Sequence, residues 1–208
     1  GPAVPQAATS PTEATQPERP SRLLLIGDYF LQANLGVDAH LKAMAITASP
    51  TISLEPALLA STSDQRSYTL KLTWDAGSAL SRIRQDEPDV VVLYEDLAPM
   101  TDQQEFKESV GKFENEIRNT GAETVLFMPW EYDLKLKKVT IEEIARVYSD
   151  LANELGVKVA PVGLAWQRAR QESPTPDLYY ADRMGPSIYG TYLAACVLYA
   201  TILGEDPT

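Results

Sequence analysis

The chain of 208 residues contains one histidine, His40, and one cysteine, Cys196. A single cysteine excludes an intrachain disulfide, and one histidine with one cysteine cannot form the clusters that hold zinc. Carboxylate-only sites for hard cations stay open, but no EF-hand-like run of acids is present. We therefore expect no metal and no cofactor. No apolar run reaches the roughly 18–20 residues that a membrane-spanning helix needs.

Positive charge is scarce as well, with 18 Lys and Arg against 29 Asp and Glu and a net charge of −11. Nucleic acid and anionic lipid surfaces would repel such a chain, so we expect neither as a partner. Attachment to a membrane is expected only through an N-terminal anchor that precedes this sequence. The hydrophobic share of 44% is sufficient for a sizeable core.

Two regions are distinguished by composition. Residues 1–21 are rich in Pro, Ala, Thr, Gln and Ser, which predicts a disordered linker that cannot bury a core; its first two residues, Gly1 and Pro2, resemble the scar left by removal of a tag. Residues 22–208 are expected to form one domain. Linkers of this kind often tether extracytoplasmic domains, so we expect a periplasmic or cell-surface location. The alternative is a frayed terminus of a cytoplasmic protein.

Strand and helix patterns alternate along residues 22–208. Short apolar runs predict strands at residues 23–26, 89–94, 123–128 and 157–161, and apolar residues at helical spacing predict helices at 34–46, 78–84, 105–119, 141–155, 164–171 and 188–203. Residues 67–73 favour a further strand, because Tyr68, Leu70 and Leu72 alternate. The alternation predicts a three-layer α/β/α fold, doubly wound and flavodoxin-like, with a mostly parallel sheet. Ligands of such folds bind beyond the carboxyl ends of the strands.

Three segments resemble the sequence blocks of one enzyme family. Residues 24–30, which contain Gly27-Asp28-Tyr29-Phe30, are similar to a first block in which Gly-Asp-Ser-Phe follows a strand. Residues 90–95 resemble a strand that ends in Asn, and residues 182–195 resemble a final Asp-x-x-His-Pro-Ser block with its helix. The family is the SGNH (GDSL-type) hydrolase superfamily, and the resemblance spans about residues 22–207.

The resemblance implies a mechanism whose main groups are replaced here. The family uses a serine nucleophile, a histidine base oriented by an aspartate, and an asparagine that stabilises the oxyanion. This chain has Tyr29, Gly185 and Tyr94 at the serine, histidine and asparagine positions, and only the aspartate, Asp182, matches. The chain is therefore interpreted as a degenerate member. His40 lies within the first helix and is interpreted as a surface histidine.

These replacements favour a catalytically inactive domain that acts in binding or assembly, with a cell-envelope glycan or a protein as its partner. The alternative is an esterase or carbohydrate O-acetylesterase with a rewired site, in which Asp28 and Asp182 could act as a carboxylate pair. Aromatic and acidic side chains near the strand ends suit sugar binding, although the tyrosines could simply plug a defunct pocket. The candidate ligand-binding residues are Asp28, Tyr29, Tyr94, Trp130, Tyr132 and Asp182.

Overall fold

The structure is a computed structural model that describes residues 20–60, 68–97, 100–135 and 139–207. Its strands are β1 (Arg22–Gly27), β2 (Glu55–Ala60), β3 (Val90–Tyr94), β4 (Glu123–Phe127) and β5 (Lys158–Ala160). A 3-10 helix, η1 (Tyr29–Leu35), follows β1. The α-helices are α1 (Val37–Thr47), α2 (Leu70–Ala76), α3 (Ser78–Asp86), α4 (Gln103–Thr120), α5 (Ile141–Leu155), α6 (Val162–Glu172) and α7 (Ile188–Leu203). In these described segments, no helix combines the length and apolar character that crossing a membrane requires.

The five strands form one parallel sheet in the order β2-β1-β3-β4-β5. The strands are almost wholly apolar because helices cover both faces, as in other parallel sheets. The order reverses between β1 and β3, so the carboxyl ends of these two strands border the crevice where ligands of doubly wound folds bind. Those ends carry Gly27 and Tyr94.

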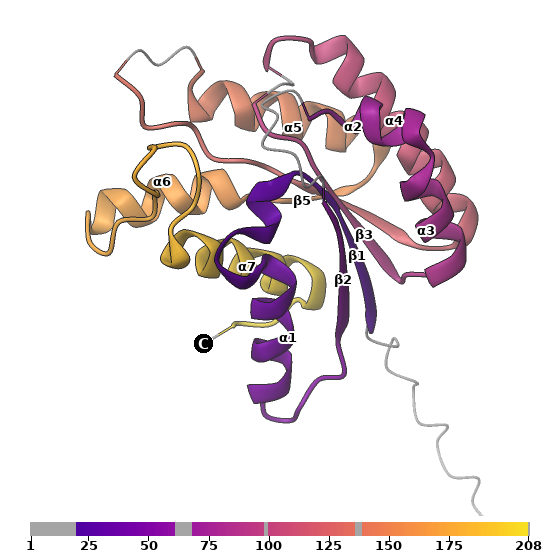
Figure 1. Cartoon of the computed structure of the whole chain (residues 1–208), viewed down its shortest axis with the longest axis horizontal. Coiled ribbons are helices and arrows are strands. Elements are labelled where there is room, and N and C mark those ends of the chain that lie inside the picture. Colours follow the sequence, from indigo (N-terminus) through magenta and orange to yellow (C-terminus); the bar gives the residue numbers. More distant parts are fainter. Residues whose placement is uncertain (1–19, 61–67, 98–99, 136–138, 208) are drawn as a thin grey trace, which may run out of the picture.

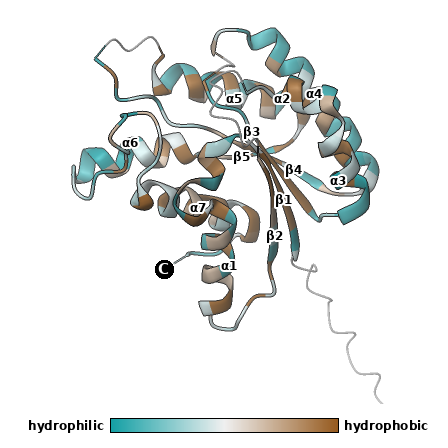
Figure 2. Ribbon diagram, viewed as in Figure 1, coloured by the Kyte–Doolittle hydropathy of each residue, from teal (hydrophilic) through white to brown (hydrophobic). Residues whose placement is uncertain are grey.

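Helices pack on the sheet in two groups, which makes the three layers seen in Figure 1. Helices α1, α6 and α7 cover one face, where Leu41, Trp166 and Leu198 join one apolar core. Helices α2 to α5 cover the other face, where Phe113 and Ile144 join a second core. Figure 2 shows hydrophobic residues concentrated on the strands and polar residues on the outer surfaces of the helices. The structure confirms the predicted three-layer α/β/α fold.

Helix α5 has the bounds predicted from the sequence, because the residues at both of its ends are strong helix-capping signals. Thr140 accepts a hydrogen bond from the backbone N–H of Glu143, while the Glu143 carboxylate accepts one from the Thr140 N–H, which forms a capping box. Gly156 ends α5 in the left-handed conformation with φ 71°.

The strand predicted at residues 67–73 is wrong. Residue 67 lies outside the described residues, and α2 begins at Leu70. Thr69 caps this helix by accepting from the Leu72 N–H, and the Glu95 carboxylate accepts from the Leu70 N–H at 2.6 Å. Leu70 is buried whereas Leu72 is 53% exposed. A cap and a distant carboxylate therefore outweigh the alternation of the side chains.

The first helix begins later than predicted. Asn34 and Leu35 at the end of η1, and Gly36 after it, have positive φ angles of 55°, 78° and 90°, and α1 begins only after them. Asn34 adopts this conformation while its side-chain amide donates to the carbonyl of Pro186 and the hydroxyl of Thr191. These bonds connect this turn to the start of α7, so tertiary contacts determine where α1 begins.

The predicted linker, residues 1–21, lies outside the described residues except for Pro20 and Ser21. The Ser21 N–H donates to the Asp89 carboxylate.

The β2 edge of the sheet carries a proline at an outward position. The N–H of Glu55 donates to the Ser21 carbonyl, toward β1. Because the backbone groups of a parallel strand face alternate sides, those of the next residue, Pro56, face away from β1. Proline has no N–H to donate, so this edge lacks a donor at that position.

Two helical glycines give a matched test of packing around α7. A Cβ atom on Gly190 would lie 2.3 Å from the Trp166 ring and 2.4 Å from the Leu178 carbonyl, whereas one on Gly111 in α4 would meet nothing within 4 Å. We expect Gly190→Ala to lower the free energy of unfolding by about 1–3 kcal/mol, because backbone must move. Gly111→Ala should raise it by about 0.5–1 kcal/mol through helix propensity. Urea unfolding measures both, and equal effects would contradict the packing described here.

Candidate functional site

The sheet brings the predicted site segments together at its carboxyl edge. Asp28 and Tyr29 follow β1, Tyr94 ends β3, and Trp130 and Tyr132 follow β4. The final block reaches the same edge from the connection between α6 and α7. It is fixed there by the Trp130 indole N–H, which donates to the Met184 carbonyl at 2.9 Å, and by Gly185, which lies against the Phe30 ring.

Tyr29 occupies the position of the family's serine at the start of η1. The turn before it is held by Asp28, whose carboxyl oxygen accepts from the Phe30 N–H at 2.8 Å. Tyr29 is half-buried, and its ring lies 4.4 Å from that of Phe30 between centroids. A phenol ionises near pH 10, so it is a poor nucleophile at neutral pH unless a base lies beside it.

Tyr94 fills the centre of the site and has no exposed surface. Its Cβ packs against Gly27, where any added side chain would lie within 3 Å, and its ring contacts Phe127 edge-on at 4.7 Å. Its hydroxyl has no hydrogen-bond partner among the described residues. Burial and the nearby carboxyls of Asp28 and Asp96 raise the pKa of Tyr94 well above its usual value. The phenol is therefore neutral and cannot serve as an anion or a base.

Gly185 stands where the family has its histidine, and the space beside it is taken. A Cβ at this position would lie 3.0 Å from the Phe30 ring, so any other residue here would require that ring to shift by a few tenths of an ångström. Asp182 is exposed, and its carboxylate accepts from the N–H groups of Met184 and Gly185, both at 2.9 Å. The aspartate thus stabilises its own loop.

His40, the single histidine of the chain, lies on α1. Its Nε2 is 3.1 Å from the Asn34 carbonyl oxygen, and its ring lies 6.1 Å from that of Tyr192 on α7. The contacts that the structure gives His40 are with the η1–α1 turn and α7 and do not include Tyr29 or Asp182.

Three acidic residues gather beside Tyr94. Asp28 and Glu95 are buried, and Asp96 is half-buried. Burial, reinforced by the charge of Asp96, raises the pKa of Asp28 to about 8, although the Phe30 N–H opposes the shift. Burial likewise raises the pKa of Glu95 to about 7 and that of Asp96 to about 6. These carboxyls are therefore partly protonated near neutral pH and can donate as well as accept protons.

Tyr132 and Tyr148 complete the polar interior of the site. The Tyr132 hydroxyl donates to the Asp96 carboxylate, and the Tyr148 hydroxyl donates to the Glu95 carbonyl at 2.9 Å. Sequence reasoning missed Tyr148, because it lies on the apolar face of α5 and reads as core. The signal in the sequence is its hydroxyl group, because a buried tyrosine hydroxyl needs a hydrogen-bond partner and so indicates a polar group nearby.

The candidate ligand-binding residues differ in their exposure to solvent. Tyr94 and Trp130 are buried, Tyr29 and Tyr132 are half-buried, and Asp182 is exposed on the final block. Asp28 has Asp96 and Glu95, not Asp182, among the charges that shift its pKa. Within the described segments, no group of three or more acidic, histidine or cysteine side chains is arranged to hold a metal ion.

The buried carboxyls predict an unusual pH dependence of stability. A carboxyl whose pKa is raised by folding stabilises the folded state fully below its ordinary pKa, near 4, and this contribution is lost as pH rises through the folded value. The melting temperature should therefore fall between about pH 4 and 8, and Asp28→Asn should reduce the fall across this interval. Asp150→Asn, at an exposed position, is the control. Equal slopes in both variants, measured by thermal unfolding, would count against a protonated Asp28.

No protein-family model matches the sequence, and no curated protein sequence matches it either. Solved structures do match its fold. A protein from Slackia heliotrinireducens described as an SGNH hydrolase superposes with a TM-score of 0.71 and 21% identity, over 88% of this chain and 99% of its own. The acetylxylan esterase from Geobacillus stearothermophilus gives a TM-score of 0.67 and 16% identity, over 91% and 97%.

A protein from Parabacteroides merdae described as a GDSL-like lipase gives a TM-score of 0.68 and 12% identity, over 90% of this chain and 97% of its own. At these identities the likeness concerns the fold. The similarity covers 88–91% of this chain, in agreement with a resemblance of the sequence blocks that spans most of it. The chain has the fold of the SGNH (GDSL-type) hydrolases.

Proposed function

We propose that this chain is a catalytically inactive SGNH-fold domain that acts by binding or assembly. The observation that carries the proposal is the absence of a base at Gly185, where the Phe30 ring occupies the adjoining space. Ester hydrolysis by this fold needs an imidazole to take the proton of the nucleophile. The contacts of His40, the single histidine, are with the Asn34 carbonyl and the Tyr192 ring, which supports the proposal.

The spacing within the final block supports this assignment. Two solved structures of the Geobacillus acetylxylan esterase are catalytic mutants in which a histidine, and an aspartate three positions before it, are each replaced by alanine. The same spacing separates Asp182 from Gly185 in this chain. The Asp182 carboxylate, with no imidazole to orient, accepts from two backbone N–H groups of its own loop.

A glycan of the cell envelope or a protein is the partner class that we propose for such a domain. The net charge of −11 disfavours polyanionic partners. The composition of residues 1–21 supports a tethered, extracytoplasmic location, because such linkers hold a domain at a distance from its anchor.

One observation favours the alternative, an esterase or carbohydrate O-acetylesterase with a rewired site. Burial raises the pKa of Asp28, which precedes the half-buried Tyr29, to about 8 and that of Asp96 to about 6, and both carboxyls lie close enough to Tyr132 to raise its pKa. Two carboxyls with separated pKa values can act as acid and base in hydrolysis. This alternative predicts activity that depends on Asp28.

Hydrolysis of p-nitrophenyl acetate and butyrate separates the two functions. The inactive domain should release nitrophenol no faster than buffer does, and Asp182→Ala and Asp28→Asn should not change the rate. The Geobacillus esterase serves as the positive control. Turnover by the unaltered chain that is lost on Asp28→Asn would establish the rewired esterase and refute the inactive domain. Turnover that is lost only on Asp182→Ala would also refute the inactive domain, because the final block would then act in catalysis.

A further inference from the structure

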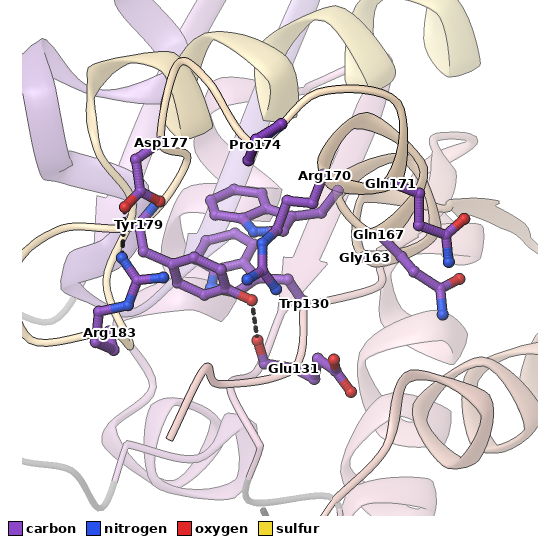
Figure 3. Close-up of a pocket in the computed structure, with 11 residues that line it drawn as sticks. Trp130, Glu131, Gly163, Gln167, Arg170, Gln171, Pro174, Asp177, Tyr179 and Arg183 are labelled. Carbon is purple, nitrogen blue, oxygen red and sulfur yellow. Dashed lines mark hydrogen bonds and ion pairs between the residues drawn. The ribbon is translucent and has the colours of Figure 1, made fainter. Parts of the chain in front are cut away.

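A cavity of about 480 Å³ lies beside the candidate site and has no counterpart in the sequence-based interpretation. It is formed by α6, by the residues that follow β4, and by the connection from α6 to α7 (Figure 3). Its volume is within the range of about 300–1,000 Å³ that is usual for small-molecule sites. Residues that line it include Trp130, Trp166, Gln167, Arg170, Tyr179 and Arg183.

We propose that this cavity binds an uncharged sugar ring of a glycan. The inference rests on the proposed binding function and moves the ligand away from the position of Tyr29 and Tyr94. The cavity shares only Trp130 with the six candidate residues predicted from the sequence.

Charge on the cavity walls is balanced, which argues against an ionic ligand. The Arg170 guanidinium donates to the Asp133 carboxylate at 3.1 Å, and Arg183 pairs with both Asp133 and Asp177. Glu131 also lines the cavity, and its carboxylate accepts from the Ile141 N–H at 3.2 Å. An anion would have to displace the carboxylates that hold the arginines, and a cation would have to displace the arginines themselves.

Hydrogen-bond donors and acceptors both lie around the opening of the cavity, as a ligand rich in hydroxyl groups requires. In Figure 3, Gln167 and Gln171 lie on one side of the cavity, and Asp177 and Arg183 lie on the other. Each glutamine amide can donate and accept, and a guanidinium has five N–H donors. An acyl chain would leave these polar groups desolvated and unpaired, so it fits poorly.

The floor of the cavity is rigid and aromatic. The rings of Trp130 and Trp166 stack at 4.2 Å between centroids with an interplanar angle of 10°, and the Tyr179 ring meets Trp166 edge-on at 5.3 Å. The guanidinium carbons of Arg170 and Arg183 lie 4.9 Å and 5.0 Å from the Tyr179 ring centre, and the Tyr179 hydroxyl donates to the Glu131 carbonyl at 2.6 Å. These contacts hold the polar groups in place before a ligand arrives, which lowers the entropy cost of binding.

The position of the tryptophans provides a direct readout. Trp130 and Trp166 line the cavity, whereas Trp74, the third tryptophan, packs against Phe113 on the opposite face of the sheet. A sugar in the cavity should shift the indole N–H resonances of Trp130 and Trp166 in NMR spectra and leave that of Trp74 unchanged. The spectrum of a Trp74→Phe variant lacks the Trp74 indole resonance and thereby assigns it, so that this resonance can serve as the internal reference.

The experiment titrates the full chain with xylose, glucose, galactose, mannose and N-acetylglucosamine. Glucuronic acid and glucose 6-phosphate serve as charged comparisons. At least one neutral sugar should shift the two cavity resonances saturably and bind more tightly than the charged sugars. The double variant Gln167→Ala, Gln171→Ala should weaken that sugar about tenfold, which corresponds to about 1.4 kcal/mol. Gln104→Ala on α4, an exposed glutamine that bonds only within its own helix, is the matched control and should bind as the unaltered chain does.

Three results would overturn the sugar site: no neutral sugar shifts the cavity resonances, a charged sugar binds as tightly, or the double variant binds unchanged. Thermal unfolding of the double variant excludes misfolding as the cause of a loss. These outcomes are distinct from a failure of the proposed function. Ester turnover that depends on Asp28 or Asp182 would refute the inactive domain whatever the sugars do, and failed titrations without turnover would refute the sugar site alone.

Discussion

The buried ring of Tyr94 is the constraint on which the rest of the candidate site depends. It packs against Gly27 at the end of β1 and against Phe127 on β4, so it occupies the centre of the crevice where the strand order reverses. The neighbouring carboxyls of Asp28 and Glu95 are buried as well, Glu95 against Leu70 of α2, and burial makes both hold their protons more strongly than exposed acids do. A site with a filled centre and partly protonated acids differs chemically from an open cleft with a nucleophile and a base.

Local signals in the sequence were sufficient to predict most of the fold. The apolar run of β3 and the capping residues around α5 are contained within a few positions, and both elements form where the pattern places them. The prediction failed where distant residues decide the structure. The segment at Leu70 is a helix because Glu95 accepts from its first N–H, and α1 begins at Val37 because Asn34 is bonded to Pro186 and Thr191. Neither partner could be identified from spacing along the chain.

The same limit applies to the site. The replacements at Tyr29, Tyr94 and Gly185 could be read directly by comparison with the family blocks, but their burial could not. The cavity beside them is made by residues that look like ordinary packing in the sequence, since Trp166 and Tyr179 belong to a core and Arg170 to an amphipathic helix. Asp133 accepts hydrogen bonds from Arg170 and Arg183, which lie 37 and 50 residues further along the chain. Such a network becomes visible only when the fold places its members together.

Pro56 has a consequence for any assembly that contains this domain. A neighbouring polypeptide that added itself as a sixth strand beside β2 would find a missing donor at the second position of the ladder. Strand-to-strand growth into extended fibres is disfavoured at that margin of the protein. A chain that packs beside β2 would have to rely on its side chains more than on a continuous ladder of backbone hydrogen bonds, whereas Pro56 sets no such limit on β5 at the other edge of the sheet.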